Sequence, residues 1–312
     1  MKYIKKTLDF QIQEPTVVTL GKFDGLHRGH DKLMHALLKY KETHQVASVA
    51  FTFDIPPRNK VDDVSSKVLT TNEEKEYIFG TSGIDYLIEC PFTTEVMCME
   101  PKKFIEWISK ALHMKCVVVG DDFRFGHNRA GDYQTLMQYE KEYGYETIVV
   151  EKMKDNNRDI SSTYVREEIA AGNLQKANEL LGYHYFIKSD VVHGKKLGRT
   201  IGVPTINMVL PENKLLPPNG VYVTELIIEE KKYVGVTNVG CKPTVSDANM
   251  IGVETYILDF DQMVYGDSIV VSFVEYIRPE KKFSSVEELK AQLKEDIADA
   301  KRYYANYYKN VT

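Results

Sequence analysis

The sequence has few of the features that mark secreted, membrane-spanning or zinc-binding proteins. Its four cysteines show no CxxC spacing and no paired histidines accompany them, so we expect free thiols in a reducing cytoplasm and no structural zinc. No apolar run approaches the roughly 18 residues that a membrane helix needs. The lysines near the start have no apolar stretch behind them, so we expect no secretory signal.

A strong charge of one sign is missing as well. The formal net charge is −5, which argues against broad binding to nucleic acid or to anionic membranes. The chain also has no internal repeat, no low-complexity linker and no signal for an oligomeric state. It does have an ordinary globular composition, with 312 residues of which 43% are hydrophobic and 27% charged, enough for about two domains.

The first half alternates strand-like and helix-like segments. Near-continuous apolar runs predict strands that are buried on both faces, as in a parallel sheet. These strands are expected at Thr16–Gly21, Val46–Phe53, Tyr86–Glu89, Cys116–Gly120 and Thr147–Glu151. Apolar residues at helical spacing lie between them, so the first half is predicted to be an α/β domain that binds ligands beyond the carboxyl ends of its strands.

The pattern changes after Gly182. Before this glycine, two short helices are expected at Thr163–Ala171 and Leu174–Leu181. After it, strand-like segments with glycine and proline between them continue to about Lys282 and predict a small closed β-barrel. A serine–glutamate capping box then opens a C-terminal helix. The apolar stripe of this helix consists of Val286, Leu289, Leu293 and Ile297. We therefore expect domains at residues 1–182 and 183–312.

The turn between the first strand and the first helix is a candidate phosphate site. The segment Gly21–His30 reads GKFDGLHRGH, and its glycines would let backbone N–H groups approach a phosphate at the helix N-terminus. His27 and His30 could stabilise charge on a leaving pyrophosphate. Taken alone, the two histidines could equally be surface residues in the first turn of a helix.

Two later segments could complete this site. The sequence ISSTYVR at 160–166 places hydroxyl groups at a helix start and an arginine one turn further on. These groups suit phosphate recognition, although they also make an ordinary helix cap with a solvated arginine. The loop GDDFRFG at 120–126 follows a predicted strand and suits contacts with a nucleotide or an aromatic ring.

The strand-rich half contains a second candidate site. Its glycines at 194, 198 and 202 could let a loop close over phosphates, or could simply shape a barrel corner. Thr205 and Asn207 lie two apart on a predicted strand and so face one side, either as ligands of Mg²⁺ or as a satisfied polar pair. Glu254 lies on a later strand, where a lone carboxylate is ordinarily solvated.

Together the motifs resemble one enzyme family. KFDGLHRGH, GDDFRFG with a following GD, and ISSTYVR resemble the FMN adenylyltransferase half of the prokaryotic bifunctional riboflavin kinase/FAD synthetases. HGKKLGRTIGVPTIN, GVTNVGCKPT and VETYILDF resemble their riboflavin kinase module. The resemblance implies a Rossmann-like nucleotidylyltransferase domain with a parallel sheet, followed by a kinase barrel with a C-terminal helix. It also implies a cytoplasmic enzyme that uses ATP, riboflavin, FMN, FAD and Mg²⁺, without nucleic-acid or membrane partners.

The resemblance further implies roles for individual residues. His27 and His30 would act on the ATP phosphates of the adenylyltransferase, and Glu254 would be the general base of the kinase. ATP would also contact Gly21, Phe23, Asp24, Gly25, Ser162, Thr163 and Arg166, and FMN would contact Asp122, Phe123, Arg124 and Phe125. ATP and flavin in the kinase would contact Gly194, Lys195, Gly198, Arg199, Gly202, Pro204, Thr205, Asn207 and Arg278. Of these, Thr205 and Asn207 would also bind the metal.

Three positions depart from the family pattern. Pro56 stands where the family has the histidine of TFDPHP, Ile206 replaces the alanine of PTAN, and Tyr256 replaces a histidine. The change at Pro56 leaves open a monofunctional riboflavin kinase with an impaired adenylyltransferase half. A flavin-binding regulator without turnover is a further hypothesis.

Overall fold

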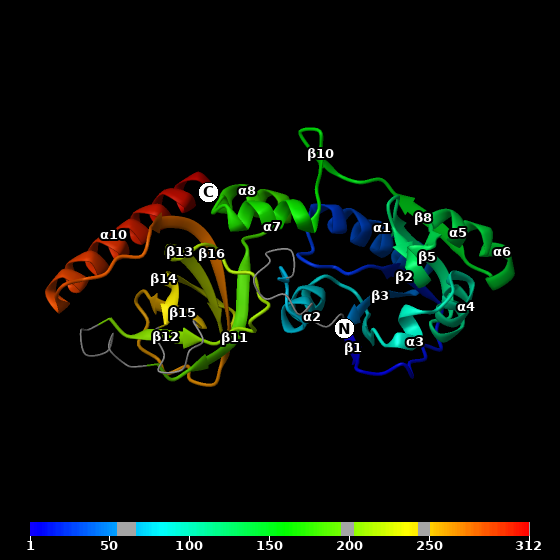
Figure 1. The fold of residues 1–312 in the computed structure, drawn as a ribbon, viewed down its shortest axis with the longest axis horizontal. Helices are drawn as coiled ribbons and strands as arrows, with labels where there is room; N and C mark the ends of the chain where they lie inside the picture. Colours follow the sequence, from blue (N-terminus) through cyan, green and yellow to red (C-terminus); the bar gives the residue numbers. More distant parts are fainter. Residues whose placement is uncertain (55–66, 195–202, 243–249, 312) are drawn as a thin grey trace. The chain divides into compact units, whose positions relative to one another are not determined.

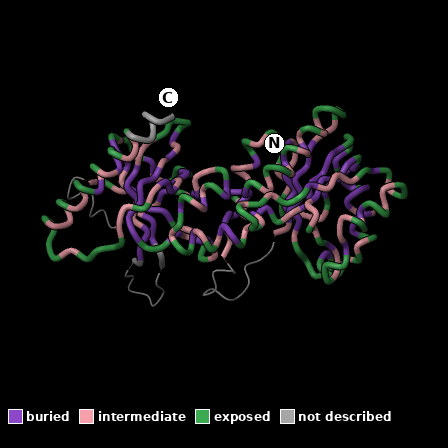
Figure 2. The backbone as a smooth tube through the Cα atoms, turned by 90° about the horizontal axis from the view of Figure 1, so that it is seen from above, coloured by how far each residue is buried: buried purple, intermediate pink, exposed green. Residues whose placement is uncertain are grey.

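The chain folds into two units. The computed structural model describes residues 1–54, 67–194, 203–242 and 250–311. Contacts group the described residues as far as Tyr164 into one unit, and those from Val165 onwards, together with Lys67, into the other. In both units the buried residues gather in the interior and the exposed residues lie on the outside (Figure 2).

The first unit is built on a sheet of six parallel strands in the order β1-β4-β3-β2-β5-β8 (Figure 1). The strands are β1 (Lys2–Lys5), β2 (Thr16–Leu20), β3 (Ala47–Asp54), β4 (Tyr86–Pro91), β5 (Met114–Gly120) and β8 (Glu146–Val150). The five predicted strands are therefore confirmed. The sequence did not predict β1, a half-exposed edge strand flanked by lysines.

Helices cover both faces of this sheet. They are α1 (Arg28–His44), α2 (Asn72–Thr81), α3 (Thr94–Met97), α4 (Pro101–Ala111), α5 (Tyr133–Gln138) and α6 (Glu140–Tyr143). Successive residues of β2 enter different apolar clusters, because Val17 shares one with Leu37 of α1 whereas Val18 shares another with Ile105 of α4. Strands buried on both faces are what the near-continuous apolar runs predict.

Short elements complete the first unit and lead into the second. They are β6 (Arg124–Phe125), the 3₁₀ helix η2 (His127–Arg129), β7 (Gly131–Asp132), β9 (Lys154–Asp155), β10 (Arg158–Asp159), α7 (Ser162–Ala170) and α8 (Leu174–Leu181). As predicted, α8 ends at Gly182, which has φ of 85° in the left-handed region. The single tryptophan, Trp107 of α4, packs in the core of the first unit with its ring centroid 5.1 Å from that of Phe10.

The second unit is a closed antiparallel barrel with strand order β11-β12-β15-β14-β13-β16 (Figure 1). Its strands are β11 (Phe186–Val192), β12 (Thr205–Met208), β13 (Gly220–Ile228), β14 (Lys231–Lys242), β15 (Met250–Ile257) and β16 (Ser268–Arg278). Pairing of β16 with both β13 and β11 closes the barrel. The predicted fold class, a parallel α/β sheet followed by a small barrel and a C-terminal helix, is thus confirmed.

A chain of threonine hydroxyls crosses three strands of the barrel. Thr224, Thr237 and Thr255 are fully buried, and their Oγ1 atoms are linked by two hydrogen bonds of 2.8 Å. Since side chains alternate along a strand, the next residue on β14, Asn238, and the preceding residue on β15, Glu254, lie on the opposite face.

The C-terminal helix α10 (Val286–Val311) lies against the barrel strands β13 and β14. The predicted capping box is formed in part: Ser285 Oγ accepts a hydrogen bond from Glu288 N, but the Glu288 carboxylate accepts from Ser284 N and Oγ instead of from Ser285 N. The predicted apolar stripe needs one correction: Val286 is 45% exposed, because the helix begins outside the edge of the barrel (Figure 1). Leu289, Leu293 and Ile297 do face the barrel.

The domain boundary at residue 182 stays a prediction that two fragments can test. Helix α8 buries Leu180 and Leu181, and Asn178 bonds to the backbone of Tyr185 and of Phe273. We expect fragment 183–312 to fold, because its barrel is closed. Fragment 165–312 should have a free energy of unfolding larger by about 3 kcal/mol or more, the usual cost of removing one buried leucine. Urea titrations followed by circular dichroism measure both, and a non-cooperative transition of 183–312 would contradict the boundary.

Candidate active sites

The turn between β2 and α1 brings two histidines together at the carboxyl edge of the sheet. The rings of His27 and His30 are stacked, with centroids 4.0 Å apart. His27 is only 7% exposed. Phe23, predicted to contact ATP, is fully buried, and its ring lies edge-on to His30 at 5.4 Å. Its side chain therefore supports the histidine pair from the core.

Burial keeps both imidazoles neutral. It lowers the pKa of His27 to about 4. It lowers the pKa of His30 well below the usual value, and the neighbouring His27 adds to that shift. Within residues 1–54, 67–194, 203–242 and 250–311, neither Nδ1 atom has a hydrogen-bond partner. Two neutral imidazoles with unengaged nitrogens at the start of a helix are suited to meet an anion.

Glycines give this turn its shape. A Cβ atom at position 29 would lie 3.1 Å from both Cε1 and Nδ1 of His27, so a side chain there would press on the imidazole. Gly25 has φ of 86°, a left-handed conformation that glycine adopts at little cost. The glycines of the motif therefore have local packing and backbone roles of their own.

Hydrogen bonds tie the turn to two other segments. Asp24 Oδ1 accepts hydrogen bonds from Leu69 N at 2.8 Å and Thr70 N at 3.0 Å. Gly25 N donates to Thr70 Oγ1 at 3.0 Å. Ser162 Oγ donates to Asp24 O at 2.7 Å. The structure thus joins the predicted Ser162 to the turn. It also shows that Thr70 bonds to the turn, a contact that the sequence does not reveal because Thr70 only precedes the capping residue of α2.

The loop after β5 gathers aromatic rings. Phe123 and Phe125 are stacked with centroids 5.5 Å apart, and Phe125 is 6% exposed. A Cβ atom at Gly131 would lie 2.8 to 2.9 Å from the ring atoms of Phe125. This close approach explains the glycine of the GD dipeptide that follows the loop.

The charged residues predicted for FMN binding form ion pairs. Lys152 Nζ lies 3.0 Å from Asp122 Oδ2, and Arg124 Nη1 lies 3.6 Å from Asp132 Oδ2. Both pairs are partly exposed, so each is worth little in stability and can exchange partners.

Helix α7 carries two more residues predicted to bind ATP. Thr163 lies in its first turn, and Arg166 lies one turn further on. Arg166 Nε donates to Lys67 O at 2.9 Å, a contact within the second unit.

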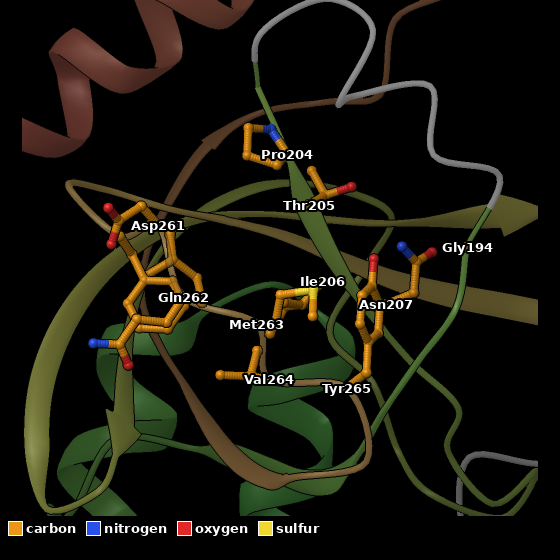
Figure 3. A pocket seen from close by; sticks show the side chains of 12 residues that line it. Gly194, Pro204, Thr205, Ile206, Asn207, Asp261, Gln262, Met263, Val264 and Tyr265 are labelled. Carbon is orange, nitrogen blue, oxygen red and sulfur yellow. The ribbon is translucent and has the colours of Figure 1, made fainter.

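In the barrel, Thr205 and Asn207 project to the same side of β12 (Figure 3). Asn207 is 5% exposed, and a Cβ atom at Gly194 would overlap its side-chain amide. Gly194, Pro204, Thr205, Asn207 and the segment 260–265 line a cavity of about 370 Å³. Thr205 and Asn207 therefore face the same side of β12, as their spacing predicts.

Glu254 lies between two asparagines of the neighbouring strands. It is opposite Asn207 on β12 and opposite Asn238 on β14. Glu254, Asn238 and Thr205 line a second cavity of about 210 Å³, which is closed on one side by residues of α10. The sequence did not single out Asn238, because only the strand register places it beside Glu254.

Arg278 joins the barrel to the C-terminal helix. Its Nε and Nη2 atoms donate to the two carboxylate oxygens of Asp296, each at 2.8 Å. Asp296 is 1% exposed, and both residues line the smaller cavity. The predicted binding residue is thus held in place by a paired, buried charge.

Five residues of the predictions, Pro56, Lys195, Gly198, Arg199 and Gly202, lie outside the described residues. Their roles stay predictions, as does the effect of proline at position 56.

Comparisons with known proteins assign both halves. The sequence model of the FAD synthetase family matches residues 9–164, and that of the riboflavin kinase family matches residues 181–304. A bifunctional riboflavin kinase/FMN adenylyltransferase of Escherichia coli (strain K12) is 36% identical, over 94% of this chain and 94% of that protein. Proteins of the same name from Listeria monocytogenes and Bacillus subtilis are each 34% identical, over 93% and 95% of this chain and 92% and 95% of their own lengths. The chain belongs to the bifunctional riboflavin kinase/FMN adenylyltransferase family.

This family member phosphorylates riboflavin to FMN and adenylylates FMN to FAD, with ATP as co-substrate. The matches to both families do not favour a monofunctional kinase or a non-catalytic regulator. A crystal structure of a Streptococcus pneumoniae protein, which is called a macrolide-efflux protein, has the same fold. Its TM-score is 0.82 at 32% identity, covering 96% of this chain and 98% of that one. Within the described part of the chain, no helix has the length and apolar character needed to cross a membrane.

The low pKa of His27 can be measured directly. The folded protein favours the neutral ring, so it loses stability as the pH falls from about 6.5 towards 4, the interval in which the unfolded chain binds the proton more tightly. In NMR titrations of the imidazole Cε1–H signals, we expect a midpoint near 4 for the signal that is missing from His27→Gln. A midpoint near 6.5 would contradict the buried, neutral histidine.

Proposed function

We propose that the stacked histidines stabilise the transition state of adenylyl transfer. In this reaction an oxygen of the FMN phosphate attacks the α-phosphorus of ATP, and the bond to pyrophosphate breaks as the new P–O bond forms. Negative charge grows on the pyrophosphate, where ring N–H groups of His27 and His30 act as donors at the start of α1. The burial of His27 and the unengaged Nδ1 atoms of both rings within the described residues support this role. No protein nucleophile is needed, so catalysis rests on positioning and charge stabilisation.

The substrates of this half are held by the segments around the histidines. The backbone of Gly21, Asp24 and Gly25, with Phe23 beneath, forms the cradle for the ATP phosphates. Hydroxyl groups of Ser162 and Thr163 complete it. The hydrogen bond between Ser162 and Asp24 supports this arrangement. The role of Arg166 in ATP binding is proposed from the family resemblance alone. FMN binds at the end of β5, where its ring system can stack on aromatic side chains. The FMN-binding residues proposed are Asp122, Phe123, Arg124 and Phe125.

The kinase reaction takes place where the two barrel cavities meet. Thr205 lines both cavities, whereas Glu254 lines only the smaller one, and this is the observation that carries the proposal. ATP occupies the larger cavity beside Gly194 and Pro204. Riboflavin occupies the smaller one, against Arg278 and α10. Lys195, Gly198, Arg199 and Gly202 cover the phosphates by the family resemblance.

Magnesium fits the donors at this junction. The hydroxyl of Thr205 and the amide oxygen of Asn207 are hard, neutral oxygen ligands on one side of β12, and ATP phosphates would supply the charge. A bound Mg²⁺ would neutralise charge on the phosphoryl oxygens. Packing of Gly194 on Asn207 keeps the amide in place for such a role.

Glu254 acts as the general base. It accepts the proton of the ribityl hydroxyl while that oxygen attacks the γ-phosphorus of ATP and the bond to ADP breaks. Pairing of β15 with β12 and β14 places Glu254 opposite the two asparagines. The proposed setting is the cytoplasm, where ATP is available, with small molecules and no nucleic acid as partners.

Crossed variants of the full-length chain test the two sites against each other. We expect His30→Ala to reduce FAD formation from supplied FMN by about 10²–10³-fold, the usual loss for one charge-stabilising donor, and to leave riboflavin phosphorylation unchanged. Glu254→Gln should reduce FMN formation by about 10²–10⁴-fold and spare adenylylation. Chromatography of riboflavin, FMN and FAD measures both reactions. A variant that impairs both equally, or neither, would refute its assignment.

Two glycine variants test the support of the same side chains. Gly194→Ala should displace the Asn207 amide and reduce FMN formation by about 100-fold, the cost of a misplacement near 1 Å. Gly29→Ala should displace the His27 ring less than Gly194→Ala displaces the amide, because the added Cβ atom would lie 3.1 Å from the ring. We expect it to reduce FAD formation by about tenfold. Gly80→Ala is the control, because a Cβ atom at this helical glycine would meet nothing within 4 Å and its φ is not in the left-handed region. Normal kinetics of Gly194→Ala would remove Asn207 from the mechanism.

A further inference from the structure

The first turn of α2 contains charged residues that are buried without belonging to either proposed substrate site. Thr71 caps this helix with a reciprocal capping box to Glu74. Glu74 is fully buried, and Lys75 is 9% exposed. Burying a lysine costs free energy unless negative charge compensates for it. The surroundings of Lys75 should therefore supply that charge.

Three carboxylates from different parts of the first unit supply the compensating charge. Asp24 belongs to the histidine turn, Asp54 ends β3, and Glu89 lies near the end of β4. All three act on Lys75 electrostatically, and they raise its pKa against the lowering effect of burial. The cluster thus spans the carboxyl ends of two strands and the turn that begins at the end of a third.

Hydrogen bonds hold the carboxylates in place without the lysine. Asn72 Nδ2 donates to Glu89 Oε1 at 3.0 Å and to Asp54 Oδ1 at 3.4 Å. Tyr3 OH donates to Glu89 Oε2 at 2.5 Å. Asp24 accepts the backbone hydrogen bonds from residues 69 and 70 described above. Lys75 is buried and lies three residues after Asn72 on α2, on the helix side that bonds to Asp54 and Glu89, so its contribution is positive charge beside this cluster.

We propose that Lys75 is a positioning residue for adenylyl transfer, which balances Asp24, Asp54 and Glu89 and so holds the histidine turn in its productive shape. Without that charge the carboxylates repel one another at low dielectric. Asp24 lies on the turn itself, so repulsion on its carboxylate would strain its bonds to residues 69 and 70 and shift the backbone of Gly25 and the contact with Ser162. The inference rests on the proposed role of this turn.

The test uses the full chain and the variant Lys75→Met, which keeps an unbranched side chain of similar length and removes the charge. We expect the catalytic efficiency of FAD formation to fall by about 10- to 100-fold, as for a displaced catalytic group. Riboflavin phosphorylation, measured in the same sample, should not change. Lys39→Met, an exposed lysine of α1, is the control for loss of one positive charge and should behave as the unaltered protein.

A second variant separates positioning from direct binding. In Lys75→Met/Glu89→Gln the number of uncompensated charges is restored, and we expect most of the lost FAD formation to return. Full activity of Lys75→Met overturns the inference, because the lysine would then only fill space. A loss that Glu89→Gln does not relieve also overturns it, because the lysine would then contact substrate or stabilise the fold. His30→Ala separates the two proposals. If His30→Ala forms FAD at the normal rate, the proposed role of the histidines is wrong, whatever the result for Lys75→Met.

Discussion

The alternation of side chains along strands is the constraint on which the barrel site depends. Thr237 and Thr255 point to the interior, where their hydroxyls form a buried chain with Thr224. Asn238 and Glu254, one residue away, must then point to the other face. A slip of one residue would bury the carboxylate and expose the hydroxyls. The cost of burying an uncompensated carboxylate therefore protects the position of Glu254.

A related constraint shapes both proposed ATP sites: a side chain with a proposed role rests directly on a backbone without a Cβ atom. His27 packs on Gly29, and Asn207 packs on Gly194. In each case the glycine lies close in space to the group that it supports, although only the first pair is close in sequence. Glycines in phosphate-binding motifs are usually explained by ligand approach. Here they have an additional role in packing the protein's own side chains.

Local patterns in the sequence predict much of this protein, and contacts between distant segments explain what they miss. Apolar runs located the inner strands, and a cluster of glycines and histidines marked the turn proposed as the first site. Helix α2 was not predicted, because its first turn buries Glu74 and Lys75, which look like surface residues until the carboxylates of β3 and β4 are brought beside them. Asn238 was missed for the same reason, since the register of β14 and β15 is not visible in either strand alone.

The position of Trp107 has a practical consequence for the study of the two halves. It is the only tryptophan of the chain, and it lies among the rings of Phe10, Phe51 and Phe104 in the first unit. Tryptophan fluorescence therefore reports on the adenylyltransferase half, while the kinase barrel contributes tyrosine signals such as those of Tyr185 and Tyr222. The natural chain thus carries a spectroscopic label for one half. Fluorescence excited where tyrosine absorbs little can follow the melting of that half within the intact enzyme.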